Sequence, residues 1–225
     1  MIRVSVHLRS WWCIRLGPLA ILLTAVLPLS ARPAGEGAGP RHMLWAVSGA
    51  SNTVYLIGSL HLMKPTDYPL PEIFTSAFSN SAVLVTEVDM ATLADPAVGK
   101  QMADRGRLPE GKKLADVVDM RTLDAVSNRL VRMGVPLDAV SGCRPWLAAM
   151  TLTILKLRDL SYSPANGLDV YFDQCARKAG VPIRGLETAI QQVELFEGLS
   201  AADQEALLTF TVGELRSEEH TSELQ

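Results

Sequence analysis

The sequence predicts one α/β domain with a central sheet and a largely helical middle section; an α+β arrangement is the alternative. Two observations favour this class. Short apolar or β-branched runs of strand length lie near both ends of the domain, at residues 44–48, 53–57, 82–88 and 182–186. The chain between residues 93 and 157 instead shows helical spacing. Hydrophobic residues make up 48% of the 225, which supports a core and excludes a disordered chain.

The N-terminus has the layout of a secretory signal peptide, predicted at residues 1–31. Arg3, Arg9 and Arg15 carry positive charge, an apolar run follows at 16–29, and small residues come at its end. The run is shorter than the roughly 20 residues that span a bilayer. We therefore expect export to the periplasm or outside the cell, with membrane contact only through this segment; an uncleaved anchor is the alternative. Residues 32–43 are expected to form a Gly-rich, flexible lead-in.

The last ten residues, 216–225, read RSEEHTSELQ. They resemble the in-frame translation of a common sequencing adapter; a natural polar tail is the alternative. The domain is therefore expected to cover residues 44–215 and to be incomplete at its C-terminus, where it stops inside a helix.

The predicted elements follow from local signals. Gly49 to Asn52 separates the first two strands, which predicts a hairpin. Pro71 suits the first turn of a helix over 71–80. The apolar run at 82–88 is typical of a central strand covered on both faces. Further helices are expected at 93–102, 122–133, 145–157, 167–179 and 188–199, and a last one from Ser200, with Asp203 in a capping-box position.

Charge and cysteine content exclude two kinds of site, a nucleic-acid-binding surface and a cysteine-rich zinc site. The formal net charge of −3, without a basic patch, excludes nucleic acid as a natural partner. Cys143 and Cys175 remain after the predicted cleavage, and they either pair in an oxidising compartment or stay as buried thiols. Their spacing is not Cys-x-x-Cys, which excludes a Cys-rich zinc site.

Three ionisable side chains follow predicted strands: His61, Glu87 and Glu187. Ligands of open α/β sheets bind at the carboxyl ends of strands. If these strands are parallel neighbours, about 4.8 Å apart, the three side chains converge on one cleft and hold a divalent metal or run acid–base chemistry. Each also has a structural explanation: a turn hydrogen bond for His61, an ordinary strand exit for Glu87, and a cap of the helix begun at Thr188 for Glu187.

Several segments, in order, resemble the TraB/GumN family, which includes the Tiki proteases. The segments are LWAVSGASNTVYLIGSLHLMKPTDYPLP, LVTEVDM, CRPWLAAMTLT, GLDVYFDQCARKAGVPIRGLETAIQQVELFEGLS and AADQEALL. The resemblance implies a fold similar to the erythromycin-esterase and ChaN-like folds. It also implies functional roles for Gly58–His61, Glu87 with Asp89, and Gly185–Thr188 with Gln192.

The Tiki members resemble metal-dependent peptidases, so the resemblance implies a metal-dependent hydrolase acting on a peptide or small-molecule substrate, with His61 and Glu87 as ligands of a divalent ion. Glu187 would be a further ligand, a base or an orienting carboxylate. The family's second Gly-x-x-His is missing, since the residue three positions before His220 is Ser217 rather than glycine. We therefore expect this truncated chain to be inactive. The alternatives are a non-catalytic envelope binding module and a metal-independent esterase with His61 as general base.

Overall fold

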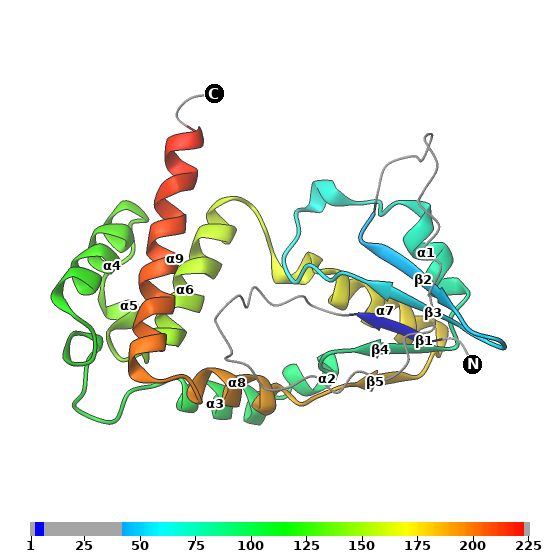
Figure 1. Cartoon of the computed structure of the whole chain (residues 1–225), viewed down its shortest axis with the longest axis horizontal. Coiled ribbons are helices and arrows are strands. Elements are labelled where there is room, and N and C mark those ends of the chain that lie inside the picture. The colour runs from blue at the N-terminus through cyan, green and yellow to red at the C-terminus, as the bar shows by residue number, and fades with distance from the viewer. Residues whose placement is uncertain (1–2, 7–41, 223–225) are drawn as a thin grey trace, which may run out of the picture.

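The computed structural model describes residues 3–6 and 42–222 and confirms the mixed α/β class. A sheet with helices α1 (Glu72–Ser79) and α7 (Leu168–Ala179) forms one end of the molecule (Figure 1). A group of helices forms the other end, and α3 (Pro96–Arg105) and α8 (Ala189–Glu197) lie side by side along the edge that joins the two.

The sheet has the strand order β2-β3-β1-β4-β5. β2 (Leu44–Ser48) and β3 (Thr53–Ile57) form the predicted antiparallel hairpin, closed by a hydrogen bond of 2.7 Å from the Gly49 amide to the Asn52 carbonyl. The other pairings are all parallel, and they join β3, β1, β4 (Val83–Thr86) and β5 (Ile183–Gly185). The carboxyl ends of these four strands therefore point to the same edge.

The central strand, β1 (Arg3–Val6), was not predicted, because its residues belong to the expected signal peptide. It lies between β3 and β4 and pairs with both. β3 and β4 are therefore not direct neighbours, whereas β4 and β5 are. The remainder of the expected signal peptide and the lead-in, residues 7–41, lies outside the described residues.

One face of the sheet packs against α1 and α7. Ile57 and Leu84 from the strands meet Phe74 of α1 and Phe172 of α7, and all four are buried. Every residue of β4 is buried, as expected for a central strand, but this strand is shorter than the predicted 82–88. It ends where the Thr86 hydroxyl donates a 3.0 Å hydrogen bond to the Val88 carbonyl and turns the chain.

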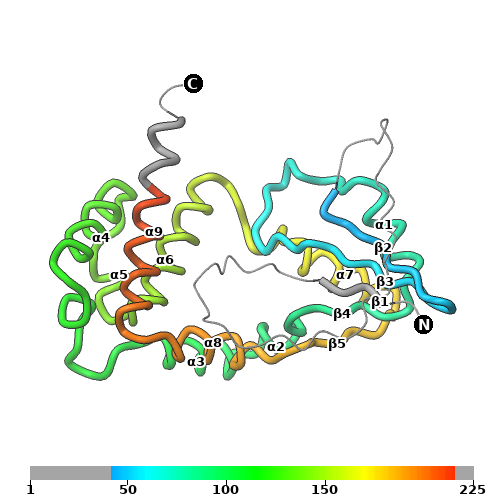
Figure 2. Tube along the Cα trace, in the orientation of Figure 1, coloured from blue at the N-terminus to red at the C-terminus, as the bar shows by residue number. Residues whose placement is uncertain are grey.

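The second core lies among the helices at the other end. It unites α4 (Met120–Arg132), α5 (Asp138–Ser141), α6 (Pro145–Asp159) and α9 (Ala201–Ser222), with α6 and α9 side by side (Figures 1 and 2). Ser200 accepts a hydrogen bond of 3.1 Å from the Asp203 amide, as its predicted capping role requires. Helix α9 continues to residue 222, past the expected domain end at 215.

The helix predicted at 93–102 is present as α3, but it begins at Pro96, and a separate short helix, α2 (Met90–Leu93), precedes it. Asp95 caps α3 by accepting a 2.8 Å hydrogen bond from the Ala97 amide. Pro96 occupies the first turn of α3 and disfavours a helical conformation at the residue before it. Short 3₁₀ turns occur at Pro65–Asp67, Leu114–Asp116 and Pro164–Asn166.

Two further expectations concern membranes and thiols. No helix among the described residues has the length and apolar character needed to cross a membrane. Cys143 and Cys175 are both free thiols, so the disulfide is not formed. Cys143 packs against the helical core, and burial raises the pKa of its thiol. Cys175 lies on α7, beside the sheet.

Candidate functional site

The loop that carries His61 is fixed to the segment that begins α7. The Leu168 amide donates a 2.9 Å hydrogen bond to the Leu60 carbonyl. Ser163 and Met63 exchange backbone hydrogen bonds, at 2.9 Å from the Ser163 amide and 3.3 Å from the Met63 amide. This bracing holds His61, which would otherwise lie on a free loop after β3, against the first turn of α7.

Gly167 permits this close approach. A Cβ atom at this position would lie 2.4 Å from the His61 carbonyl oxygen and 2.5 Å from the Asp169 carboxylate, distances that are not tolerated in proteins. Since the backbone dihedral φ of Gly167 is −60°, its need for glycine is one of space rather than of conformation. The Gly-x-Asp order therefore places the Asp169 carboxylate beside the histidine.

His61 and Asp169 form a close pair. The His61 Nδ1 atom lies 2.7 Å from the Asp169 Oδ2 atom. Asp169 is only 7% exposed, and its Oδ1 atom has no hydrogen-bond partner among the described residues. Its position in the first turn of α7 suits a negative charge, because the helix dipole is positive there. When Nδ1 carries the shared proton, Nε2 is the nitrogen left for chemistry.

The environment raises the pKa of His61 above 6.5. The hydrogen bond to Asp169 is the largest cause; burial opposes it, and the negative charges of Asp169 and Glu87 add to it. The effect of Glu87 shows that the two predicted site residues lie within electrostatic reach of each other, although β1 separates their strands.

Glu87 and Glu187 meet at the ends of β4 and β5. The Gln192 side chain, from α8, donates hydrogen bonds of 3.2 Å to Glu87 Oε2 and 3.0 Å to Glu187 Oε1. The Glu187 amide also donates a 2.9 Å bond to the Glu87 carbonyl. The structural explanation of Glu187 as the cap of α8 does not hold. Thr188 caps this helix, and its hydroxyl accepts a hydrogen bond from the Gln191 amide. Glu187 is thus joined to Glu87 through a shared amide.

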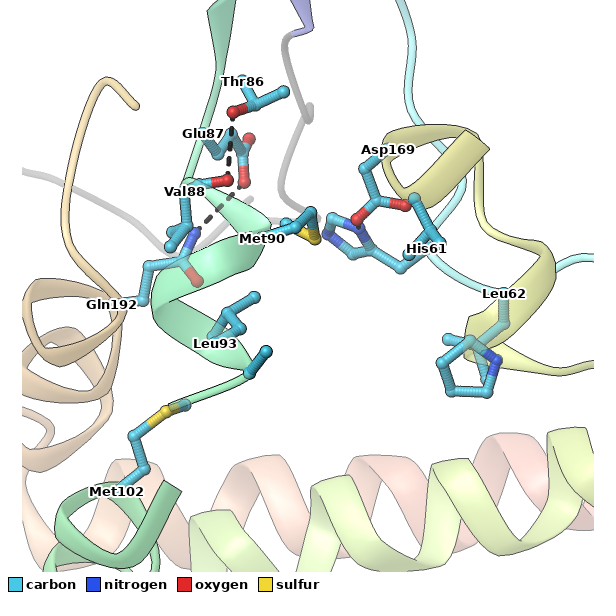
Figure 3. Close-up of a pocket in the computed structure, with 13 residues that line it drawn as sticks. His61, Leu62, Thr86, Glu87, Val88, Met90, Leu93, Met102, Asp169 and Gln192 are labelled. Carbon is cyan, nitrogen blue, oxygen red and sulfur yellow. Dashed lines mark hydrogen bonds and ion pairs between the residues drawn. The ribbon is translucent and has the colours of Figure 1, made fainter. Parts of the chain in front are cut away.

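A cavity of about 560 Å³ lies between these groups (Figure 3). His61, Asp169, Glu87 and Gln192 line it, whereas Glu187 does not. The predicted convergence is therefore found for His61 and Glu87, while Glu187 contacts Gln192 and does not line the cavity. Sequence reasoning missed Asp169; the available signal was an acidic residue two positions after Gly167, in a segment quoted for the family resemblance.

Residues 3–6 and 42–222 contain no group of three His, Cys, Asp or Glu side chains arranged to hold a metal. His61 Nε2 and the Glu87 carboxylate supply two candidate donors, whereas catalytic zinc takes three protein ligands. The described residues therefore do not fit a complete divalent-metal site. They fit an imidazole that is oriented by a buried carboxylate and open to a cavity, an arrangement that general bases and metal-bound histidines share.

Comparisons with known proteins support the family resemblance of the sequence segments. The chain is 25% identical over 141 residues to a protein of Escherichia coli (strain K12) and to one of Shigella flexneri, both described as "Uncharacterized protein YbaP". Each match covers 63% of this chain and 50% of the relative, so the chain spans about half the length of these relatives. No solved structure matches it. The profile of the TraB/PrgY/gumN family matches residues 43–224, and the chain belongs to that family.

Proposed function

We propose that this protein is a hydrolase of a peptide or small-molecule ester, with His61 as the general base. One observation carries the proposal: the 2.7 Å contact between His61 Nδ1 and the buried Asp169 carboxylate, at the wall of a cavity. The proposed setting is the periplasm or the cell exterior, which rests on the signal layout of residues 1–31.

The chemistry uses the groups in the cavity. His61 Nε2 takes a proton from a water molecule as its oxygen attacks the carbonyl carbon of the substrate. Asp169 holds the ring and stabilises the imidazolium that forms. His61 then returns the proton to the leaving nitrogen or oxygen, which gives a carboxylic acid and an amine or alcohol. Glu87, held by the Gln192 amide, orients the water from the opposite wall.

A metal-assisted reaction is the second candidate, because metal-bound histidines commonly donate their other ring N–H to a carboxylate. His61 and Glu87 would be the ligands contributed by this chain, and the ion would supply Lewis-acid activation of water. With two donors among the described residues, this candidate predicts no turnover by the present chain. The general-base candidate predicts turnover, since its two partners are both present.

The test is hydrolysis of a panel of peptides and nitrophenyl esters by the whole chain, with and without EDTA. We expect turnover that persists in EDTA, is lost in His61→Gln and is unchanged in His42→Gln. His42 is a matched control, because it packs on Phe74 away from the cavity.

Two results contradict the proposal. Turnover that EDTA abolishes and one divalent cation restores would assign the metal-assisted reaction. Absence of turnover on every substrate, by a protein shown to be folded, would favour the non-catalytic binding module.

A further inference from the structure

The cavity beside His61 has two unlike halves. The polar groups come from the end of β4, the loop after β3, α7 and α8, and the remaining wall is apolar. Six large apolar side chains build most of that wall: Leu62, Val88, Met90, Leu93, Met102 and Val170. In Figure 3, Met90 lies between Glu87 and His61, while Leu93 and Met102 continue the apolar surface away from them. A bound molecule thus meets the reacting groups and the apolar wall together.

The break between α2 and α3 shapes part of this wall. Leu93 ends α2, and Asp95 with Pro96 starts α3 in a new direction, which brings Met102 to the same cavity. Leu93 remains 39% exposed, although it is a large apolar residue. A ligand that covers it would remove apolar surface from water, which favours binding.

The charges around the cavity select against acidic ligands. Of the residues that line it, Glu87 and Asp169 are acidic, and no Lys or Arg is among them. An anionic side chain would therefore meet two carboxylates and an apolar wall, and His61 is the one lining group that can carry positive charge. Methionine side chains adapt to ligands of different shape, so Met90 and Met102 suit both aliphatic and aromatic groups.

We propose that this cavity is a binding subsite for a large, uncharged apolar side chain next to the scissile bond of the substrate. A volume of about 560 Å³ accommodates such a side chain with its flanking amide groups, within the usual range of ligand pockets. The link to a scissile bond rests on the proposed hydrolase function, whereas binding of the side chain does not.

The test measures binding without turnover, by titrating the His61→Gln variant of the whole chain with N-acetyl amino-acid amides followed by NMR. We expect the leucine and phenylalanine amides to bind at least about tenfold more tightly than the alanine amide, as apolar pockets discriminate between side chains. The aspartate amide should bind more weakly still. Leu93→Ser should remove the preference. Leu195→Ser should keep it, because Leu195 is 64% exposed and does not line the cavity.

Equal affinity for the leucine, alanine and aspartate amides would overturn the subsite, and so would an unchanged preference in Leu93→Ser. The two proposals fail separately. Selective binding by a protein that hydrolyses nothing would leave the subsite standing without the hydrolase. Hydrolysis without any side-chain preference would leave the hydrolase without the subsite.

Discussion

At the scale of single residues, the site depends on a pairing that joins distant parts of the chain. His61 and Asp169 are 108 positions apart, and their side chains meet at 2.7 Å. The sequence indicated His61 and Glu87 because each follows an apolar strand. It gave no comparable signal for Asp169, because an acidic residue in the first turn of a helix is common for reasons of capping and dipole alone. Only the folded chain shows that this carboxylate is buried against an imidazole.

Asp169→Asn should lower the pKa of His61, because it removes the negative charge that holds the proton. The raised pKa of the wild type means that protonated His61 stabilises the fold below its unfolded value of 6.5, and that this contribution is lost as pH rises through the folded pKa. The stability difference between wild type and variant should therefore be larger at pH 6 than at pH 8. NMR titration of His61 and denaturant unfolding at both pH values measure the two effects. An unchanged His61 titration would contradict the pairing.

Gly167→Ala should push His61 away from α7, since the new methyl group would lie 2.4 Å from the His61 carbonyl oxygen. Overpacking of this kind costs about 1–3 kcal/mol, which urea unfolding detects. Gly99→Ala is the control, because a Cβ there meets nothing within 4 Å and α3 gains helix propensity. Equal stability of wild type and Gly167→Ala would show that the two loops are not fixed as described.

At the scale of elements, local patterns predicted most of the fold. The β2–β3 hairpin, α1, α7 and α8 follow from short-range signals: a turn sequence, Pro71, Gly180 and Thr188. The break between α2 and α3 was missed because apolar spacing continues across it, so the periodicity outweighed the local effect of Pro96. Strand β1 was missed because its residues also fit a signal peptide and its two partners lie far along the chain.

Asp95→Ala should destabilise the protein by about 0.5–2 kcal/mol, since it removes the capping carboxylate that accepts a hydrogen bond from the Ala97 amide. Because α2 and α3 contribute Met90, Leu93 and Met102 to the apolar wall, the variant should also weaken binding of the leucine amide. Thermal unfolding and the same NMR titration measure both. Asp104→Ala is the control, as its ion pair with Lys100 is exposed and contributes at most about 0.5 kcal/mol. An Asp95→Ala variant as stable as the wild type would show that Asp95 does not cap α3.

At the scale of the whole molecule, the sheet and the expected signal peptide use the same residues. β1 supplies the pairing between β3 and β4, whereas cleavage near residue 31 would remove it. A chain that starts at residue 32 should therefore have a lower urea midpoint than the whole chain, because two strands lose their ladder partner. Identical midpoints would show that β1 contributes nothing to the stability of the sheet. N-terminal sequencing of the exported protein tests the cleavage itself, with a first residue between about 30 and 40 expected.

The whole arrangement places two braced loops, the end of β4 and the α2–α3 corner around one cavity, with the His61–Asp169 pair as its chemical centre (Figure 3). Helix α7 offers a matched comparison for that pair. Asp169 and Asp173 are both buried on it, one turn apart, but Asp173 binds Arg177 at 2.8 Å rather than the histidine. Comparing substitutions of Asp169 and Asp173 therefore separates the loss of the histidine pair from the loss of a buried carboxylate.

The most direct measurement is kcat/KM for Asp169→Asn beside Asp173→Asn, on the best substrate of the panel. We predict that Asp169→Asn lowers kcat/KM by about 10²–10⁴-fold, as loss of an orienting carboxylate does in hydrolases. Asp173→Asn should lower it less than about tenfold, because its carboxylate does not touch the histidine. Equal losses in the two folded variants, or full activity of Asp169→Asn, would contradict the assignment of His61 and Asp169 as the general-base pair.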